Sequence, residues 1–109
     1  MWLFLSNSML SIVQKRDQKP GTLTVRARAA GDIERVFPNA QVTATPKADY
    51  GYRAVIERDD IARALAHAVE ALDYDNFKDS VSEQDRHDAY AAAWAAMFHF
   101  QKARNAPSA

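Results

Sequence analysis

The chain has 109 residues, enough for one domain and too few for two of ordinary size. Apolar residues make up 48% of it and charged residues 26%, which excludes wholesale disorder. The 14 basic and 14 acidic side chains cancel, so net charge creates no global attraction to nucleic acid or anionic membranes. Cysteine is absent, which excludes disulfides and thiol catalysis and favours a cytoplasmic protein.

The apolar segment at the start of the sequence does not have the pattern of an export signal. No Lys or Arg precedes the apolar run within residues 1–13, and Ser6-Asn7-Ser8 interrupts it. Gln14-Lys15-Arg16 follows where a signal would carry a small-residue cleavage site. No apolar stretch approaches the ~20 residues that cross a bilayer. We therefore expect no membrane partner.

Five strands are predicted in the first half of the chain, over residues 2–5, 9–15, 22–28, 41–45 and 50–56. The clearest alternation is in 22–28, where Leu23, Val25 and Ala27 face one side and Thr22, Thr24, Arg26 and Arg28 face the other. The turn residues Pro20 and Gly21 predict antiparallel pairing of 9–15 with 22–28. In 50–56 the alternation places Tyr50, Tyr52, Ala54 and Ile56 on one face.

One short and two long helices are predicted. The short helix is predicted over 33–37, within the first half, capped by Asp32 and stopped by Pro38. From about Arg58 the apolar period becomes 3.6, with Ile61, Leu65, Ala68 and Leu72 on one stripe, and a second long helix spans about 83–104.

The predicted fold class is α+β: a four- to five-stranded, mainly antiparallel sheet with a short helix and two long C-terminal helices packed on one face. We expect a single domain over 1–109, with a sheet-forming half at 1–56, a helical half at 57–104 and a frayed tail at 105–109.

An acidic segment at 70–88 is the first place to look for a metal site. Asp73-Tyr74-Asp75 begins like a calcium loop, but Phe77, Lys78 and Gln84 occupy the positions that require an oxygen ligand, glycine and glutamate. The three histidines, His67, His87 and His99, form no ligand spacing either. We expect no metal, cofactor or catalytic residue; the enzyme alternative would use Asp73, Asp75 and Asp79 with His87 through a divalent ion.

The charges are unevenly distributed along the chain. Residues 1–56 carry eight basic and four acidic side chains, whereas 57–109 carry six basic and ten acidic ones. A sheet with arginines and exposed aromatic rings is typical of single-stranded nucleic-acid binding, although the aromatic strand motif of RNA-recognition sheets is missing here. The alternation leaves open whether Tyr50 and Tyr52 face solvent or core. This alternative uses Arg26, Arg28 and Arg53 with the basic turn Lys15, Arg16 and Lys19.

The last predicted helix is apolar on two sides. Its expected core face carries Tyr90, Trp94, Met97, Phe98 and Gln101, while Ala89, Ala93, Ala96 and Phe100 lie on another side. An exposed apolar strip usually marks an interface, and alanines allow a second helix to approach closely, so we predict a two-fold homodimer. The alternative is that the alanine side packs on the 61–72 helix and the Trp94 stripe on the sheet.

Four segments carry a resemblance: Ser11 to Lys15 (SIVQK), Asp49 to Ile56 (DYGYRAVI), Leu72 to Lys78 (LDYDNFK), and His87 to Tyr90 with Trp94 and Met97. Over nearly its whole length the chain resembles a family of small uncharacterised bacterial and phage open reading frames, which implies no activity or functional residue to carry over. In size and in its lack of catalytic motifs it is also similar to phage-encoded inhibitors of host defence, including anti-CRISPR proteins. Its zero net charge departs from the acidic DNA mimics among them.

The predicted function is therefore a non-catalytic protein-interaction module, of the kind that inhibits a host defence complex by occluding a surface. The candidate interface residues are Arg26, Arg28, Arg53, Asp73, Asp75, Asp79, Ala89, Ala93, Ala96 and Phe100.

Overall fold

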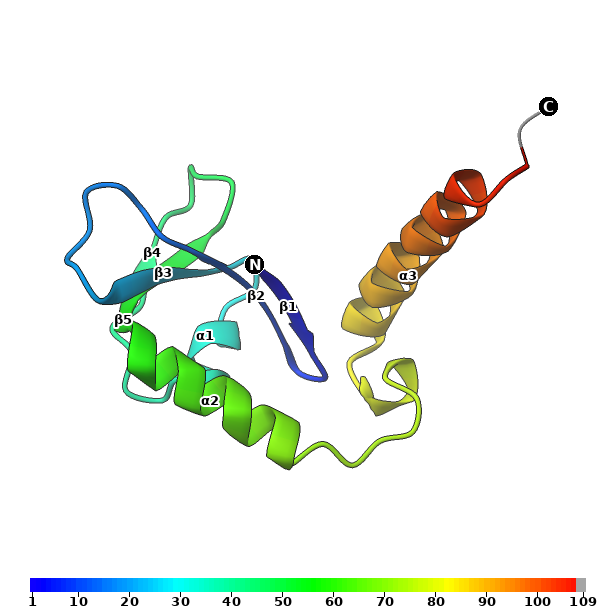
Figure 1. Cartoon of the computed structure of the whole chain (residues 1–109). Coiled ribbons are helices and arrows are strands. Elements are labelled where there is room, and N and C mark those ends of the chain that lie inside the picture. Colours follow the sequence, from blue (N-terminus) through cyan, green and yellow to red (C-terminus); the bar gives the residue numbers. More distant parts are fainter. Residues whose placement is uncertain (108–109) are drawn as a thin grey trace. The chain divides into compact units, whose positions relative to one another are not determined.

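A computed structural model describes residues 1–107 (Figure 1). The chain divides into two compact units, the first ending at Asp73 and the second beginning at Tyr74. The predicted α+β class is confirmed: the first unit contains a five-stranded antiparallel sheet and two helices, and the second contains a long C-terminal helix. The long helix that follows the sheet thus belongs to the same unit as the strands.

The sheet has the strand order β1-β2-β3-β5-β4. Its strands are β1 (Trp2–Leu5), β2 (Ser8–Val13), β3 (Thr22–Ala27), β4 (Thr43–Ala44) and β5 (Tyr52–Glu57). The expected pairing of the second and third strands is present, with Ile12 opposite Val25. β3 then pairs with β5, Val25 lying opposite Ala54, and β4 closes the far edge.

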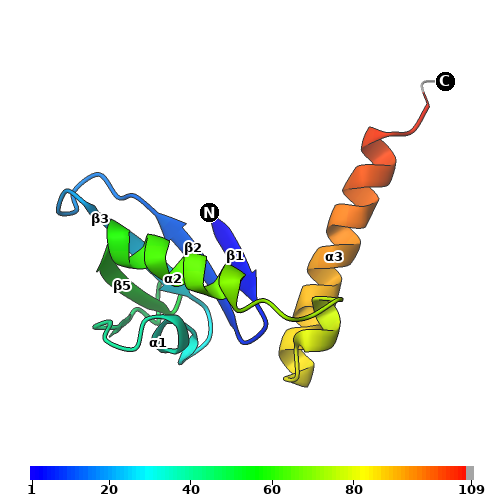
Figure 2. The ribbon, with the colours of Figure 1, turned by 60° about the horizontal axis from the view of Figure 1, so that its bottom comes forward.

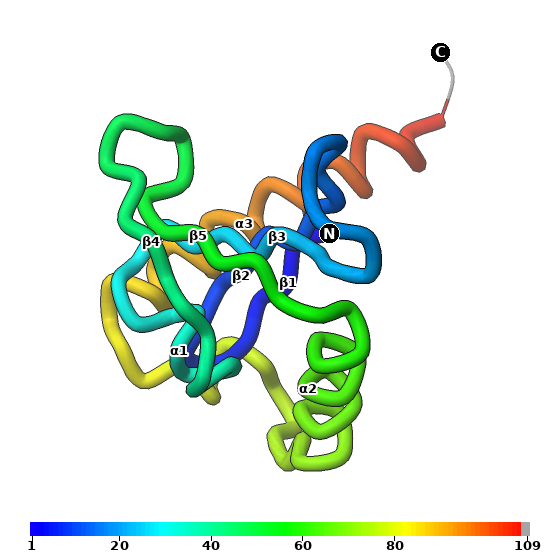
Figure 3. The backbone as a smooth tube through the Cα atoms, turned by 90° about the vertical axis from the view of Figure 1, so that its left-hand side faces the viewer, coloured from blue at the N-terminus to red at the C-terminus, as the bar shows by residue number. Residues whose placement is uncertain are grey.

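The first unit is a two-layer structure in which α1 (Asp32–Val36) and α2 (Arg58–Glu70) cover one face of the sheet (Figures 2 and 3). The core joins the inward side chains of β2, β3 and β5 to Ile33 and Phe37 around α1 and to Ile61 on α2. Of the apolar stripe predicted on this helix, Ile61 and Leu65 pack against the core as expected. Leu72 lies beyond the end of α2 and is exposed.

Two further predictions about single residues in this unit are wrong. Asp32 does not cap α1, because Gly31 is the N-cap residue and Asp32 is the first residue of the helix, with a buried carboxylate. Gly31 has a φ of 88°, which favours glycine at this point. Tyr50 does not share a face with Tyr52, because it precedes β5 and packs against arginines on the other side of the sheet.

The second unit consists of a one-turn 3₁₀ helix, η1 (Lys78–Ser80), and α3 (Gln84–Arg104). Tyr90 and Val81 are buried, and the Tyr90 ring stacks on Phe77 at a centroid distance of 5.6 Å. Arg86 donates to the Tyr90 hydroxyl and to the Glu83 carboxylate, which ties the first turns of α3 together.

Within residues 1–107, no helix is both long enough and apolar enough to cross a bilayer.

Candidate functional site

The face of the sheet opposite α1 and α2, which we call the open sheet face, carries a row of side chains that crosses all five strands. The register aligns Trp2 with Ser11, Ser11 with Arg26, Arg26 with Arg53, and Arg53 with Thr43. Arg26 Nη2 donates to Ser11 Oγ at 2.7 Å, which confirms that these two side chains share the face. Phe4 lies two residues from Trp2 and therefore on the same side of β1.

Two arginines hold Tyr50 at one end of this face. The Cζ atoms of Arg26 and Arg28 lie 4.4 and 4.1 Å from the centre of the Tyr50 ring, and Tyr50 is only 4% exposed. Such cation–π contacts contribute roughly 0.5–2 kcal/mol each. Arg28 also donates to the Asp49 carbonyl at 2.9 Å. Together these contacts fix the positions of the Arg26 and Arg28 guanidinium groups on this face.

Asp49 is the carboxylate that borders this arginine cluster. Arg53 Nη2 donates to its Oδ1 at 3.0 Å, and the Tyr50 N–H donates to the same oxygen at 3.0 Å. Desolvation acts to raise the pKa of Asp49, but the hydrogen bond from Tyr50 and the charges of Arg53 and Arg26 outweigh it and lower the pKa below its ordinary value. The Asp49–Arg53 ion pair therefore persists to lower pH than an isolated aspartate would allow.

We expect Arg53→Gln to raise the pKa of Asp49 toward its ordinary value, because it removes the nearest positive charge. A carboxyl with a depressed folded pKa stabilises the fold above its unfolded pKa and loses that contribution as the pH falls through the folded pKa. The wild type should therefore lose the stabilising contribution of the Asp49 carboxylate at a more acidic pH than the variant does. Carboxyl-carbon NMR titration of Asp49 in both proteins measures this, and identical titration midpoints would contradict the assignment.

The basic turn between β2 and β3 is held at the other end of the sheet by Gln18. Its Oε1 accepts from Lys15 N–H at 2.7 Å and from Thr24 Oγ1 at 2.9 Å, and its amide donates to Thr22 Oγ1 at 2.9 Å. These bonds bury Thr22 and Thr24 and leave Lys15 and Arg16 exposed. Lys19 lies 3.4 Å from the Glu57 carboxylate.

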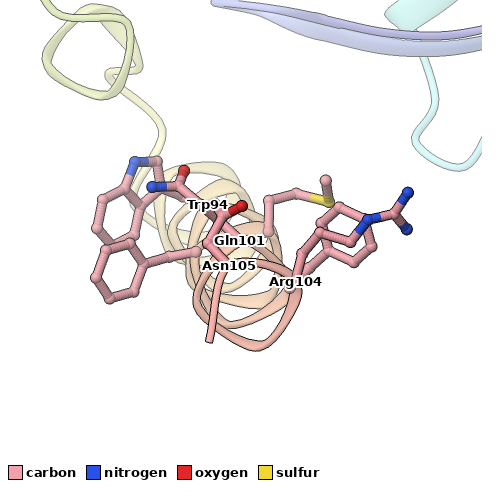
Figure 4. Close-up of a pocket in the computed structure, with 7 residues that line it drawn as sticks. Trp94, Gln101, Arg104 and Asn105 are labelled. Atoms are coloured by element: carbon pink, nitrogen blue, oxygen red, sulfur yellow. The ribbon is translucent and has the colours of Figure 1, made fainter. Parts of the chain in front are cut away.

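The second candidate surface is the apolar side of α3. The prediction that the Trp94 stripe is a core face holds only for Tyr90, since Trp94 is 54% and Met97 is 63% exposed, and Phe98 is exposed as well. The Trp94 and Phe98 rings stack at 5.3 Å with an interplanar angle of 5°. Figure 4 shows this helix with Trp94 on one side and Arg104 on another. We call the exposed large side chains Trp94, Met97, Phe98 and Phe100 the α3 apolar face.

Cations border this apolar face. Lys78 Nζ lies 4.4 Å from the centre of the Trp94 ring, Lys102 Nζ lies 5.6 Å from Phe98, and Arg104 Cζ lies 5.8 Å from Phe100. The alanine strip is next to it on the helix: Ala89 and Ala96 are exposed and Ala93 is half-buried. The large side chains and the strip therefore form one broad apolar arc.

The acidic candidates are surface residues: Asp73, Asp75 and Asp79 are all exposed. Within residues 1–107, no three His, Cys, Asp or Glu side chains come close enough together to hold a metal ion. His87 Nδ1 lies 3.8 Å from the Asp88 carboxylate.

Trp2 and Phe4 are the site residues that the sequence reasoning missed. The tyrosines were the expected aromatic groups, but Tyr50 is enclosed by arginines and Tyr52 packs against the core. The available signal was the alternation of Trp2 and Phe4 with Leu3 and Leu5 in an edge strand, which places the aromatic rings on one face.

The chain matches no protein-family model, no curated protein and no solved structure.

Proposed function

We propose that the chain is a non-catalytic protein-interaction module that assembles with a second copy of itself through the α3 apolar face. The observation that supports this is the exposure of four large apolar side chains on one helix of 21 residues. Contiguous exposed apolar surface of this kind is typical of interaction sites. A helix of this length extends about 30 Å, enough for several turns of contact with a partner helix.

The distribution of charge favours an antiparallel pair. Around the start of α3, residues 75–88 hold five carboxylates and two basic side chains, whereas the last turn carries Lys102 and Arg104. A two-fold axis near Ala93 and Trp94 would bring the acidic end of one helix beside the basic end of the other. A parallel pair would bring like charges together. The alanines near the middle allow the helices to approach closely.

Ala93→Glu is expected to convert the dimer into a folded monomer, because it places a charge in the middle of the apolar arc. Ala92→Glu is the matched control: the same substitution one residue away turns about 100° round the helix, to the exposed side that carries Asp88 and His99. Light scattering after size exclusion at ~100 μM should give twice the chain mass of 12.2 kDa for the wild type and the control, and 12.2 kDa for Ala93→Glu.

A monomeric wild type at that concentration, or equal masses for the two glutamate variants, would contradict the proposal. Circular dichroism of each variant establishes that α3 remains helical.

The proposal places this assembly in the cytoplasm, since the 109 residues contain no cysteine. Inhibition of a host defence complex stays a prediction from resemblance alone. The same dimer could present its remaining surfaces, including the open sheet face, in two copies related by symmetry.

A further inference from the structure

We propose that the open sheet face binds single-stranded nucleic acid, with a base stacked on Trp2 and phosphates held by Arg26, Arg28 and Arg53. This site lies wholly in the first unit and does not depend on the pairing of α3. Three observations support it: an exposed aromatic edge, a fixed arginine cluster and their common face.

The aromatic edge is formed by β1. Trp2 is 69% exposed, and Phe4 follows it by two residues on the same face of the strand. Two residues of strand rise about 6.6 Å, so the rings follow one another along the edge of the sheet. Base stacking on such rings tolerates any sequence, because every base has a π-face. An exposed tryptophan on an edge strand is otherwise a hazard for aggregation, which a ligand would relieve.

The arginine cluster supplies the charge that a phosphate backbone requires. Arg26 and Arg53 lie directly opposite one another on neighbouring strands, and Arg28 contacts the same Tyr50 ring as Arg26. Arg26 is bonded to a neutral hydroxyl and Arg28 to a neutral carbonyl, whereas Arg53 alone is bonded to a carboxylate, that of Asp49. Each of these bonds uses one of the five N–H donors of a guanidinium group. The cluster is therefore held in place without being electrically neutralised.

Trp2, Arg26 and Arg53 lie in one row across the sheet. The register that aligns Trp2, Ser11, Arg26 and Arg53 crosses four strands, which are spaced about 4.8 Å apart. A strand of nucleic acid that lies across the sheet could thus place a base on Trp2 while its backbone contacts the arginines. The exposed Lys15 and Arg16 extend the positive charge beyond the row.

The ligand chemistry follows from the combination of rings and charge. Duplex DNA admits a helix or a two-stranded ribbon into its major groove but offers no unstacked base to a flat sheet. An acidic peptide would engage the arginines and make no specific use of the Trp2 ring. Single-stranded nucleic acid uses both groups, and replacement of Trp2 distinguishes the cases.

The test is fluorescence anisotropy with a labelled oligothymidylate of about twelve nucleotides in low salt. The wild type is expected to bind in the micromolar range, with log K falling against log salt at a slope near −2, since three arginines each contribute about −0.7 on a single strand. Trp2→Ala should weaken binding about tenfold at unchanged slope. Arg53→Gln should lower the magnitude of the slope by about 0.7.

Matched controls come from the helical side of the first unit. Arg63 forms an exposed ion pair with Asp60 on α2, and Val69 is exposed there too, so Arg63→Gln and Val69→Ala should leave affinity and slope unchanged. Thermal unfolding shows whether each variant is folded, and Trp2→Ala, at an exposed edge position, is the variant least expected to disturb the fold.

Three results would overturn the proposal. The first is no binding at ~100 μM protein in low salt. The second is equal affinity for the single strand and its duplex, with Trp2→Ala without effect. The third is tighter binding of a polyglutamate peptide than of the oligonucleotide, which would assign the face to an acidic protein partner.

Discussion

Replacing Asp32 with alanine is expected to destabilise the first unit by about 3 kcal/mol, because it removes a buried carboxylate that several groups share. Asp32 is 1% exposed; its Oδ2 accepts from Met9 N–H at 3.0 Å and its Oδ1 from Arg35 Nη1 at 2.7 Å. Without it, the Met9 N–H loses its acceptor in a part-buried position. Arg35 keeps its bond to the Asn7 carbonyl, and its side chain is half-exposed to water. The loss of its ion pair with Asp32 therefore contributes little to the loss of stability.

Two further variants isolate the cause. Asp32→Asn keeps an oxygen for the Met9 N–H and removes only the charge, so we expect it to lose about half as much stability as Asp32→Ala. Asp60→Ala breaks an ion pair between two exposed side chains and should cost less than about 1 kcal/mol. Urea denaturation followed by circular dichroism measures all three, and an Asp32→Ala loss no larger than that of Asp60→Ala would contradict the role assigned to this carboxylate.

Asp32 also shows where reasoning from sequence reaches its limit. An aspartate before a short apolar segment is a good cap signal, and the short helix is indeed present, one residue earlier than expected. Gly31, however, takes the cap position with a left-handed conformation, and the carboxylate turns into the sheet to reach the Met9 amide, 23 residues away. A local pattern contains no information about an acceptor needed by a distant strand.

The strands were predictable because alternation is a local property. The buried Val25 and Ala27 and the pairing with β2 follow directly from the period-two pattern and from the turn at Pro20-Gly21. The boundary between units was not predictable in the same way. The change from strand to helix period near Arg58 marks a change of element, yet α2 packs on the sheet and the division comes at Asp73.

The arginines of the open sheet face were among the candidate residues predicted from the sequence, whereas the rings of Trp2 and Phe4 were not. Arg26 and Arg53 share one face, as strand periodicity and pairing require, and Arg28 contacts the same Tyr50 ring as Arg26. Tyr50 was misplaced because it lies just before β5, where the alternation of the strand no longer fixes side-chain direction. The proximity of Trp2 to Arg26 depends on β2 lying between them, which is a fact of topology.

Leu10→Ala should cost the first unit between about 3 and 5 kcal/mol, the largest loss we expect from any single truncation in the sheet. Leu10 is 0% exposed on β2, opposite Leu3 on one side and Ala27 on the other, and small neighbours such as Ala27 cannot fill the cavity. For a unit of this size, each kcal/mol lowers the melting temperature by about 4–8 °C, so a fall of at least ~12 °C is expected.

Leu72→Ala is the matched control, since the same atoms are removed from a side chain that is 53% exposed beyond the end of α2. Its cost should stay below about 1 kcal/mol. Hydrogen exchange of the β2 and β3 amides reports the stability of the sheet alone. Equal protection of these amides in Leu10→Ala and Leu72→Ala would contradict the placement of Leu10 in the core. Leu10 directly precedes Ser11, to which Arg26 donates, so the same cavity should also loosen the arginine row. Leu10→Ala should therefore weaken oligonucleotide binding even at temperatures where the variant is still folded.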